Sequence, residues 1–75
     1  MEIDREKSVM QLQSEGIIWY INILHVSAVK IDVSGNDGDA DVTFCMTNSE
    51  KISLKMKGHE VDMLRSYYKE LAAII

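Results

Sequence analysis

The stretch IIWYINIL at residues 17–24 most constrains what this chain can fold into, because seven of its eight residues are apolar. Its isoleucines and aromatic residues favour a β-strand, in which successive side chains point to opposite faces. One face would carry Ile17, Trp19, Ile21 and Ile23, and the other would carry Ile18, Tyr20, Asn22 and Leu24. Because both faces are largely apolar, both require cover from water.

Two further segments complete an antiparallel sheet. Residues 41–47 and 51–57 alternate polar and apolar side chains, and the turn-forming residues between them predict a hairpin. Within residues 17–33 the alternation breaks past His25, which predicts a bulge or bend near residues 27–28.

A helix is predicted at the C-terminal end of the sequence. Residues 59–75 place apolar side chains three and four positions apart, which forms one apolar stripe on a helix. Gly58 ends the preceding strand, and Glu60 and Asp62 occupy the first turn, where the helix dipole favours negative charge.

The N-terminal part is less clearly patterned. Residues 1–8 alternate acids and bases around Ile3, and we expect a flexible tail or a short helical turn there. Residues 9–13 fit either a first strand or the end of a short helix, and a tight turn follows at residues 14–16. The whole pattern predicts an α+β fold, a small antiparallel β-meander of three to four strands with one C-terminal helix packed on one face. The chain length predicts a single domain over residues 1–75.

The small size of the chain limits how it can be stabilised. A chain of 75 residues buries only about 60% of the surface that its unfolded form exposes. Its single cysteine, Cys45, excludes an internal disulfide, and Cys45, His25 and His59 lack the spacing of a zinc site. We therefore expect self-association as a homodimer. The unpaired cysteine, with no signal peptide and no apolar run of about 20 residues, predicts a cytoplasmic protein.

The stretch DVSGNDGDADV at residues 32–42 is the strongest chemical signal. It concentrates aspartates and glycines, but neither register that aligns it with a calcium-binding loop supplies the required ligands. An irregular calcium site at Asp37, Asp39 and Asp41 is a weak alternative. The favoured interpretation is a connection between strands with an acidic patch of Asp32, Asp37, Asp39 and Asp41. Its carboxylates lack the apolar surroundings that tune a catalytic acid, so no catalytic residue and no cofactor are predicted.

Three lysines on one face of the last predicted strand, Lys51, Lys55 and Lys57, have two interpretations. They could contact the phosphates of a nucleic acid, or they could protect an edge strand against pairing with another sheet. Edge protection is favoured, because this face lacks arginine and the aromatic residues on which bases stack. The net charge of −4 also opposes binding to nucleic acid.

The second apolar face of residues 17–24 is the main functional signal. One helix covers one face of a small sheet, so the other face is either covered by the N-terminal segment or forms a protein interface. The residues predicted for this interface are Ile18, Trp19, Tyr20 and Leu24. We expect a small, acidic, non-enzymatic protein-interaction or regulatory module. Two alternatives are an acidic inhibitor from a mobile element or phage that blocks a nucleic-acid-handling complex, and a small nucleic-acid-binding protein that uses the lysine-lined strand.

Overall fold

Within the residues that the structure describes, six strands and one α-helix follow one another, and the strands form two antiparallel sheets of three, in the orders β1-β2-β3 and β4-β5-β6. The elements are β1 (Glu2–Asp4), β2 (Val9–Ser14), β3 (Ile17–Asn22), the short 3-10 helix η1 (Ile23–His25), β4 (Val26–Val33), β5 (Ala40–Met46), β6 (Lys51–Met56) and α1 (Gly58–Ile74). This computed structural model describes residues 1–33 and 38–74, with the backbone alone at residues 72–74. The α+β class is confirmed, with more strands than the three to four predicted.

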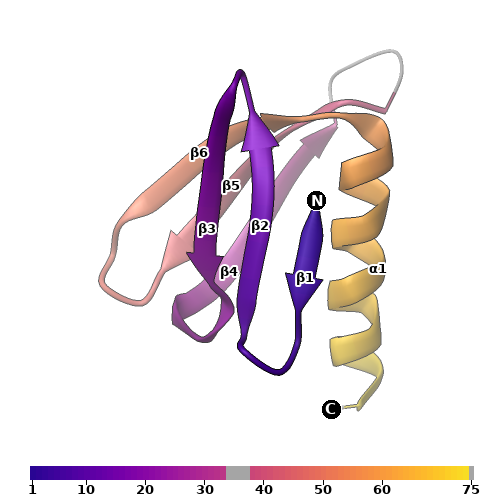
Figure 1. Cartoon of the computed structure of the whole chain (residues 1–75). Coiled ribbons are helices and arrows are strands. Elements are labelled where there is room, and N and C mark those ends of the chain that lie inside the picture. The colour runs from indigo at the N-terminus through magenta and orange to yellow at the C-terminus, as the bar shows by residue number, and fades with distance from the viewer. Residues whose placement is uncertain (34–37, 75) are drawn as a thin grey trace.

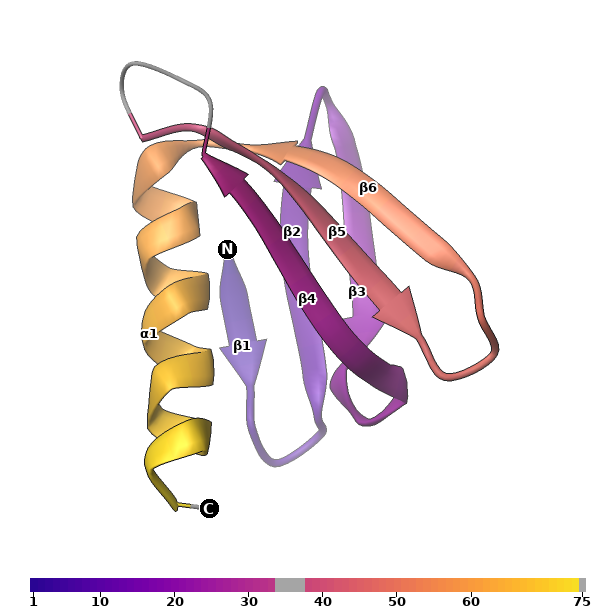
Figure 2. The same ribbon diagram turned by 180° about the vertical axis from the view of Figure 1, so that it is seen from behind.

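The two sheets lie in two layers, and α1 stands along one side next to β1 (Figure 1). Seen from behind, β4, β5 and β6 form the near layer (Figure 2). The buried apolar side chains come from both sheets and the helix: Met10, Leu12, Ile21, Ala40, Val42, Phe44, Leu54, Met56, Val61 and Leu64. The helix thus contributes Val61 and Leu64 to the core, as its apolar stripe predicts. The inner face of β4–β5–β6 is covered by the other sheet as well as by this helix.

The N-terminal residues belong to a sheet. Glu2–Asp4 form strand β1 in place of the flexible tail or helical turn expected for residues 1–8, and Ile3 lies opposite Met10 of β2. The open choice at residues 9–13 is settled as a strand, because Val9–Ser14 form β2. The physical reason is the half-buried side chain of Ile3, which packs against the core while its two neighbours face solvent.

A two-residue turn joins β2 to β3 and fixes their register. Glu15 and Gly16 have φ values of 52° and 81°, and positive φ at both positions is what a type I′ hairpin turn requires. Ser14 and Ile17 therefore pair directly across the turn. Counting from that pair, the alternation of side chains places Ile21 in the core, and the predicted tight turn is confirmed.

The break in the apolar pattern past His25 marks the passage from one sheet to the other. Helix η1 follows β3, and the side chain of Asn22 accepts a hydrogen bond from the Leu24 N–H at 3.0 Å. Strand β4 then pairs with β5 with a shift of register between Val26 and Ala28, which confirms the predicted bulge. A bulge increases the local twist of a strand, which suits a chain that has just changed sheets.

The predicted hairpin of β5 and β6 is confirmed and supplies the centre of the core. Val42 lies opposite Leu54, and Phe44 lies opposite Ile52. Val42 and Phe44 have no exposed surface. Because Phe44 is the largest of the fully buried side chains, its removal should leave the largest cavity.

The substitution Phe44→Ala should lower the free energy of unfolding by about 3–5 kcal/mol, the usual cost of deleting a buried aromatic ring. Urea denaturation measures this change, and Phe44→Leu should give a smaller loss if the alanine variant does not fold. Met63→Ala is the control, because Met63 is 46% exposed and its loss should cost less than about 1 kcal/mol. Equal losses at the two positions would contradict the burial of Phe44.

Candidate protein interaction surface

Large apolar side chains are exposed on the outer face of β3 and in η1, which follows it. Among large apolar side chains in the described ranges, Leu24 and Tyr20 are the most exposed, at 74% and 68%, and Ile18 is 53% exposed. We define these three residues as the apolar surface. Tyr20 lies opposite Gln11 and Ile18 lies opposite Gln13, so the nearest neighbours across the strand pair carry no charge.

None of the described elements covers the apolar surface. Strand β1 pairs edge to edge with β2, so the N-terminal segment extends this sheet instead of lying over it, and the whole sheet is the front layer in Figure 1. The interpretation that the N-terminal segment covers this face is therefore wrong. An exposed apolar cluster on a small protein is typical of an interaction site.

Trp19, which was grouped with the interface residues, lies on the opposite side of β3. Its side chain is half-buried and packs against the core, as the alternation of a strand requires for a residue between Ile18 and Tyr20. Its indole Nε1 is buried and has no hydrogen-bond partner among the described residues. The structure therefore brings Ile18 and Tyr20 together on one face and separates Trp19 from them.

The backbone of β3 is open along one side, because β3 is an outermost strand of its sheet. The Ile23 N–H donates a hydrogen bond to the Ser8 carbonyl oxygen at 2.9 Å. Backbone hydrogen bonds between antiparallel strands form at every second residue. Counting from Ile23 toward the N-terminus, every second residue of β3 is therefore hydrogen-bonded to β2. The residues between them direct backbone groups away from β2: the N–H and C=O groups of Ile18 and Tyr20, and the N–H group of Asn22. The Asn22 carbonyl is excluded, because Asn22 is the N-cap of η1 and its C=O accepts the first hydrogen bond of that helix. We call these groups the free edge of β3.

Strand β6 is also outermost in its sheet, but its edge is charged. The Met46 N–H donates to the Glu50 carbonyl oxygen at 2.8 Å, and by the same alternation Lys51, Ser53 and Lys55 direct their backbone groups away from β5. Two of these three residues are exposed lysines. Lysines on an edge strand oppose pairing with another sheet, which favours edge protection over phosphate contact.

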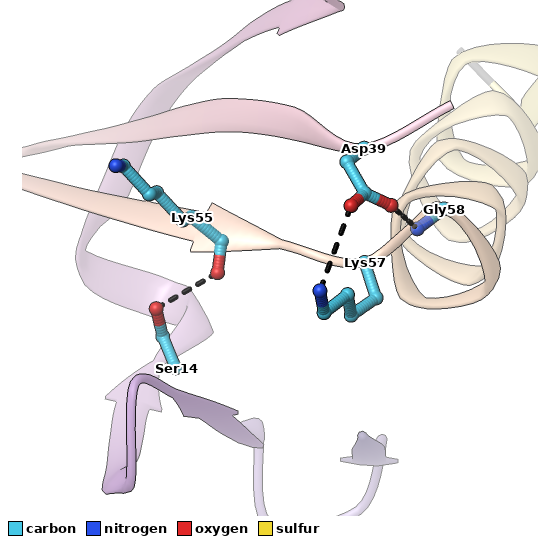
Figure 3. Close-up of polar contacts among 5 residues, drawn as sticks. All are labelled: Ser14, Asp39, Lys55, Lys57 and Gly58. Carbon is cyan, nitrogen blue, oxygen red and sulfur yellow. Dashed lines mark hydrogen bonds and ion pairs between the residues drawn. The ribbon is translucent and has the colours of Figure 1, made fainter. Parts of the chain in front are cut away.

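The third lysine, Lys57, lies beyond the end of β6. Its Nζ is 3.7 Å from Asp39 Oδ2 (Figure 3). The same view shows the Ser14 hydroxyl donating to the carbonyl oxygen of Lys55 at 2.8 Å, which ties the end of β2 to the β6 edge. The three lysines therefore differ in surroundings, and only Lys51 and Lys55 lie within the strand.

Asp39 caps the start of α1 from a distant part of the sequence. Its Oδ1 accepts a hydrogen bond from the Gly58 N–H at 2.8 Å (Figure 3). Lys57 occupies the N-cap position, because its carbonyl oxygen accepts from the Val61 N–H at 2.9 Å. A lysine side chain has no acceptor for the free N–H groups of a helix start, so the Asp39 carboxylate supplies one.

The four aspartates predicted to form an acidic patch have different surroundings. Asp39 is engaged at the start of α1. Asp32 and Asp41 lie opposite each other on β4 and β5, and Asp41 also lies opposite Lys55. Asp37 lies outside the described residues. Within the part of the chain that the structure describes, no group of three or more His, Cys, Asp or Glu residues is arranged to hold a metal ion.

The histidines and the cysteine are dispersed over different elements. His25 lies in η1, with its Nδ1 3.5 Å from the Thr47 hydroxyl, and His59 is exposed in the first turn of α1. Cys45 is a free, half-buried thiol on β5, opposite Lys51.

One contact between the two ends of the chain has no signal in the sequence. Arg5 forms an ion pair with Glu70, and its guanidinium carbon lies 5.3 Å from the centre of the Tyr67 ring. The rings of Tyr67 and Tyr68 meet edge to face with centroids 5.1 Å apart. Burial, and secondarily the neighbouring Tyr67, raises the pKa of Tyr68 above its ordinary value. These contacts hold the turn after β1 against α1.

Comparison of the chain with protein-family models, with curated proteins and with solved structures finds no match. Among the described residues, no helix combines the length and the apolar character needed to cross a membrane.

The substitution Asp39→Ala should lower the free energy of unfolding by about 1 kcal/mol, because it leaves the Gly58 N–H without its carboxylate partner. Asp41→Ala is the matched control. It removes the same charge from an exposed strand position and should change stability by less than about 0.5 kcal/mol. Thermal or urea unfolding of the two variants side by side measures the difference, and an equal effect would show that Asp39 is not a cap.

The substitution Tyr68→Phe should leave stability at neutral pH unchanged or raise it by up to about 1 kcal/mol, since it removes a buried hydroxyl without a described partner. Because the folded state raises the pKa of Tyr68, the unfolded chain ionises first. Stability should therefore fall as pH rises above about 10. Urea titrations across this range should show a smaller fall in Tyr68→Phe than in the wild type.

Proposed function

We propose that this protein is a small non-enzymatic protein-interaction module that self-associates through the apolar surface of Ile18, Tyr20 and Leu24. The observation that carries the proposal is the exposure of these side chains, of which Tyr20 and Leu24 are more than two thirds exposed. Tyrosine and isoleucine at the centre of an interface contribute large apolar contact areas. A chain of 75 residues also has a small core of its own, so a partner adds to its stability.

The charge distribution supports a second copy as the partner. The chain carries a net charge of −4, so two copies repel each other unless they meet at a neutral surface. On the outer face of β2 and β3 the paired residues are Gln11 with Tyr20 and Gln13 with Ile18, and none of them is charged. The acidic residues of this face, Glu2 and Asp4, lie on β1, at the other edge of the sheet from β3. A basic partner would instead be attracted to Asp32 and Asp41 on the other sheet.

The two alternatives have less support. The acidic-inhibitor alternative relies on a joint patch of aspartates, but Asp39 is engaged in a hydrogen bond to the start of α1. The nucleic-acid alternative relies on three lysines, but Lys57 lies beside Asp39. A cytoplasmic location and a regulatory role are part of the proposal, and the free thiol of Cys45 agrees with a reducing compartment.

The substitution Tyr20→Glu should raise the dissociation constant of the dimer at least tenfold, because it places like charges at the centre of a neutral interface. Size-exclusion chromatography with light scattering over a range of concentrations measures the mass in solution. Ser53→Glu is the matched control, because it adds the same charge at an exposed position in the middle of β6 and should leave the dimer intact. A wild-type protein that stays monomeric at high concentration would contradict self-association.

A further inference from the structure

We propose that the free edge of β3 accepts an extended, uncharged segment of another protein as an additional antiparallel strand. This inference goes beyond the proposed self-association, because it concerns backbone groups at the edge of the sheet and a different partner. The partner class is an extended peptide with alternating β-branched or other apolar residues, bound by strand addition.

Strand β3 differs from the other outermost strands in its lack of charge. The exposed charged residues on those strands are Glu2 and Asp4 on β1, Lys30 and Asp32 on β4, and Lys51 and Lys55 on β6. The six residues of β3, IIWYIN, include none. Natural sheets protect their edges with charge, proline or a covering element. In the described chain α1 also stands beside β1 (Figure 1), and β3 has no comparable protection.

The unpaired backbone groups of β3 match what an added strand requires. The alternation fixed by the hydrogen bond from Ile23 to Ser8 leaves outward N–H groups at Ile18, Tyr20 and Asn22, and outward C=O groups at Ile18 and Tyr20. These residues, at every second position, present three N–H donors in one row and two C=O acceptors, since the Asn22 carbonyl, at the N-cap of η1, accepts the first hydrogen bond of that helix. An extended chain satisfies such a row, since its own groups repeat with the same spacing.

The side chains of β3 nearest the free edge are apolar on both flanks, which favours apolar residues in an added segment. On the outer flank an added side chain would lie beside Ile18 and Tyr20. On the inner flank it would lie beside Trp19 and the exposed Ile17, next to a hollow of about 470 Å³ whose far wall on β5 and β6 also carries Asp41 and Lys55. Leu54 also lines this hollow. Cross-strand pairs of aromatic and β-branched residues stabilise a sheet, so such residues fit on either flank.

A slim segment fits this edge better than the β3 strand of a second copy. In Figures 1 and 2 the β5–β6 hairpin extends past β3 on its open side, in the layer behind it. Symmetrical pairing of two β3 strands would bring the hairpin of each copy into the space under the other copy's sheet. A single strand carries no such hairpin. Self-association through the outer face and strand addition at the edge are therefore separate events.

Hydrogen exchange followed by NMR tests the proposal with a synthetic peptide of alternating threonine and valine residues and a lysine at each end. In the free protein, the amides of Ile18, Tyr20 and Asn22 should exchange quickly, and those of Trp19 and Ile21 slowly. Saturating peptide should slow exchange at the first three by at least tenfold. Proline at every second position of the peptide removes those backbone donors and should abolish the effect.

The substitution Ile18→Lys places a lysine on the β3 edge, as β6 already has on its own edge. Because an edge lysine opposes pairing with another strand, peptide binding should weaken at least tenfold. Met63→Lys is the matched control, because it adds the same charge at an exposed apolar residue of α1, away from β3. It should bind like the wild type, with circular dichroism confirming that both variants fold. Unchanged exchange at all three amides with saturating peptide, or equal protection by the proline peptide, would overturn the proposal. If the wild type is monomeric but the peptide still slows exchange at these amides, self-association is contradicted and strand addition is not. If the wild type is a dimer but the peptide does not slow exchange, strand addition is contradicted and self-association is not.

Discussion

The alternation of side chains along β3 is the constraint on which the rest of the structure depends. Ile21 is 2% exposed and lies in the core, and Trp19 packs against the same core. A strand that buries these two residues must turn Tyr20 outward. A slip of one residue would exchange the two faces and expose the core. The exposed tyrosine is therefore a direct consequence of the burial of its neighbours.

The two ends of β3 hold this register. At one end, only Glu15 and Gly16 separate the paired residues of β2 and β3. Both have positive φ, as a tight hairpin turn requires. At the other end, η1 and the bulge in β4 carry the chain into the second sheet. The second sheet then supplies Val42 and Phe44 to the core. The outer face of β3 has no comparable cover among the described elements.

Most of the local structure could be predicted from the sequence. The hairpin of β5 and β6, the bulge after His25 and the C-terminal helix follow from periodicity and turn-forming residues, which are local properties. Strand β1 was missed because three residues around Ile3 give too short a pattern to distinguish a strand from a tail. The division into two sheets was missed for another reason, since alternation does not show which strands pair.

The candidate site was predicted in part, for similar reasons. Ile18, Tyr20 and Leu24 are exposed as the two-faced apolar pattern indicated, while Trp19 belongs to the inner face by the same period of two. The capping role of Asp39 could not be predicted, because it depends on the approach of the chain before β5 to the start of α1. The link from Arg5 to Glu70 likewise joins residues whose proximity only the fold creates.

The central claim is that two copies meet at the apolar surface of β3 and η1, and NMR relaxation by a soluble paramagnetic agent tests it most directly. The agent broadens signals that solvent can reach, so the measurement is made at low and high protein concentration. The account predicts that Ile18, Tyr20 and Leu24 become protected as concentration rises, while Lys51 and Lys55 stay accessible. Protection at the lysines, or unchanged accessibility at all five residues over the full range, would contradict it.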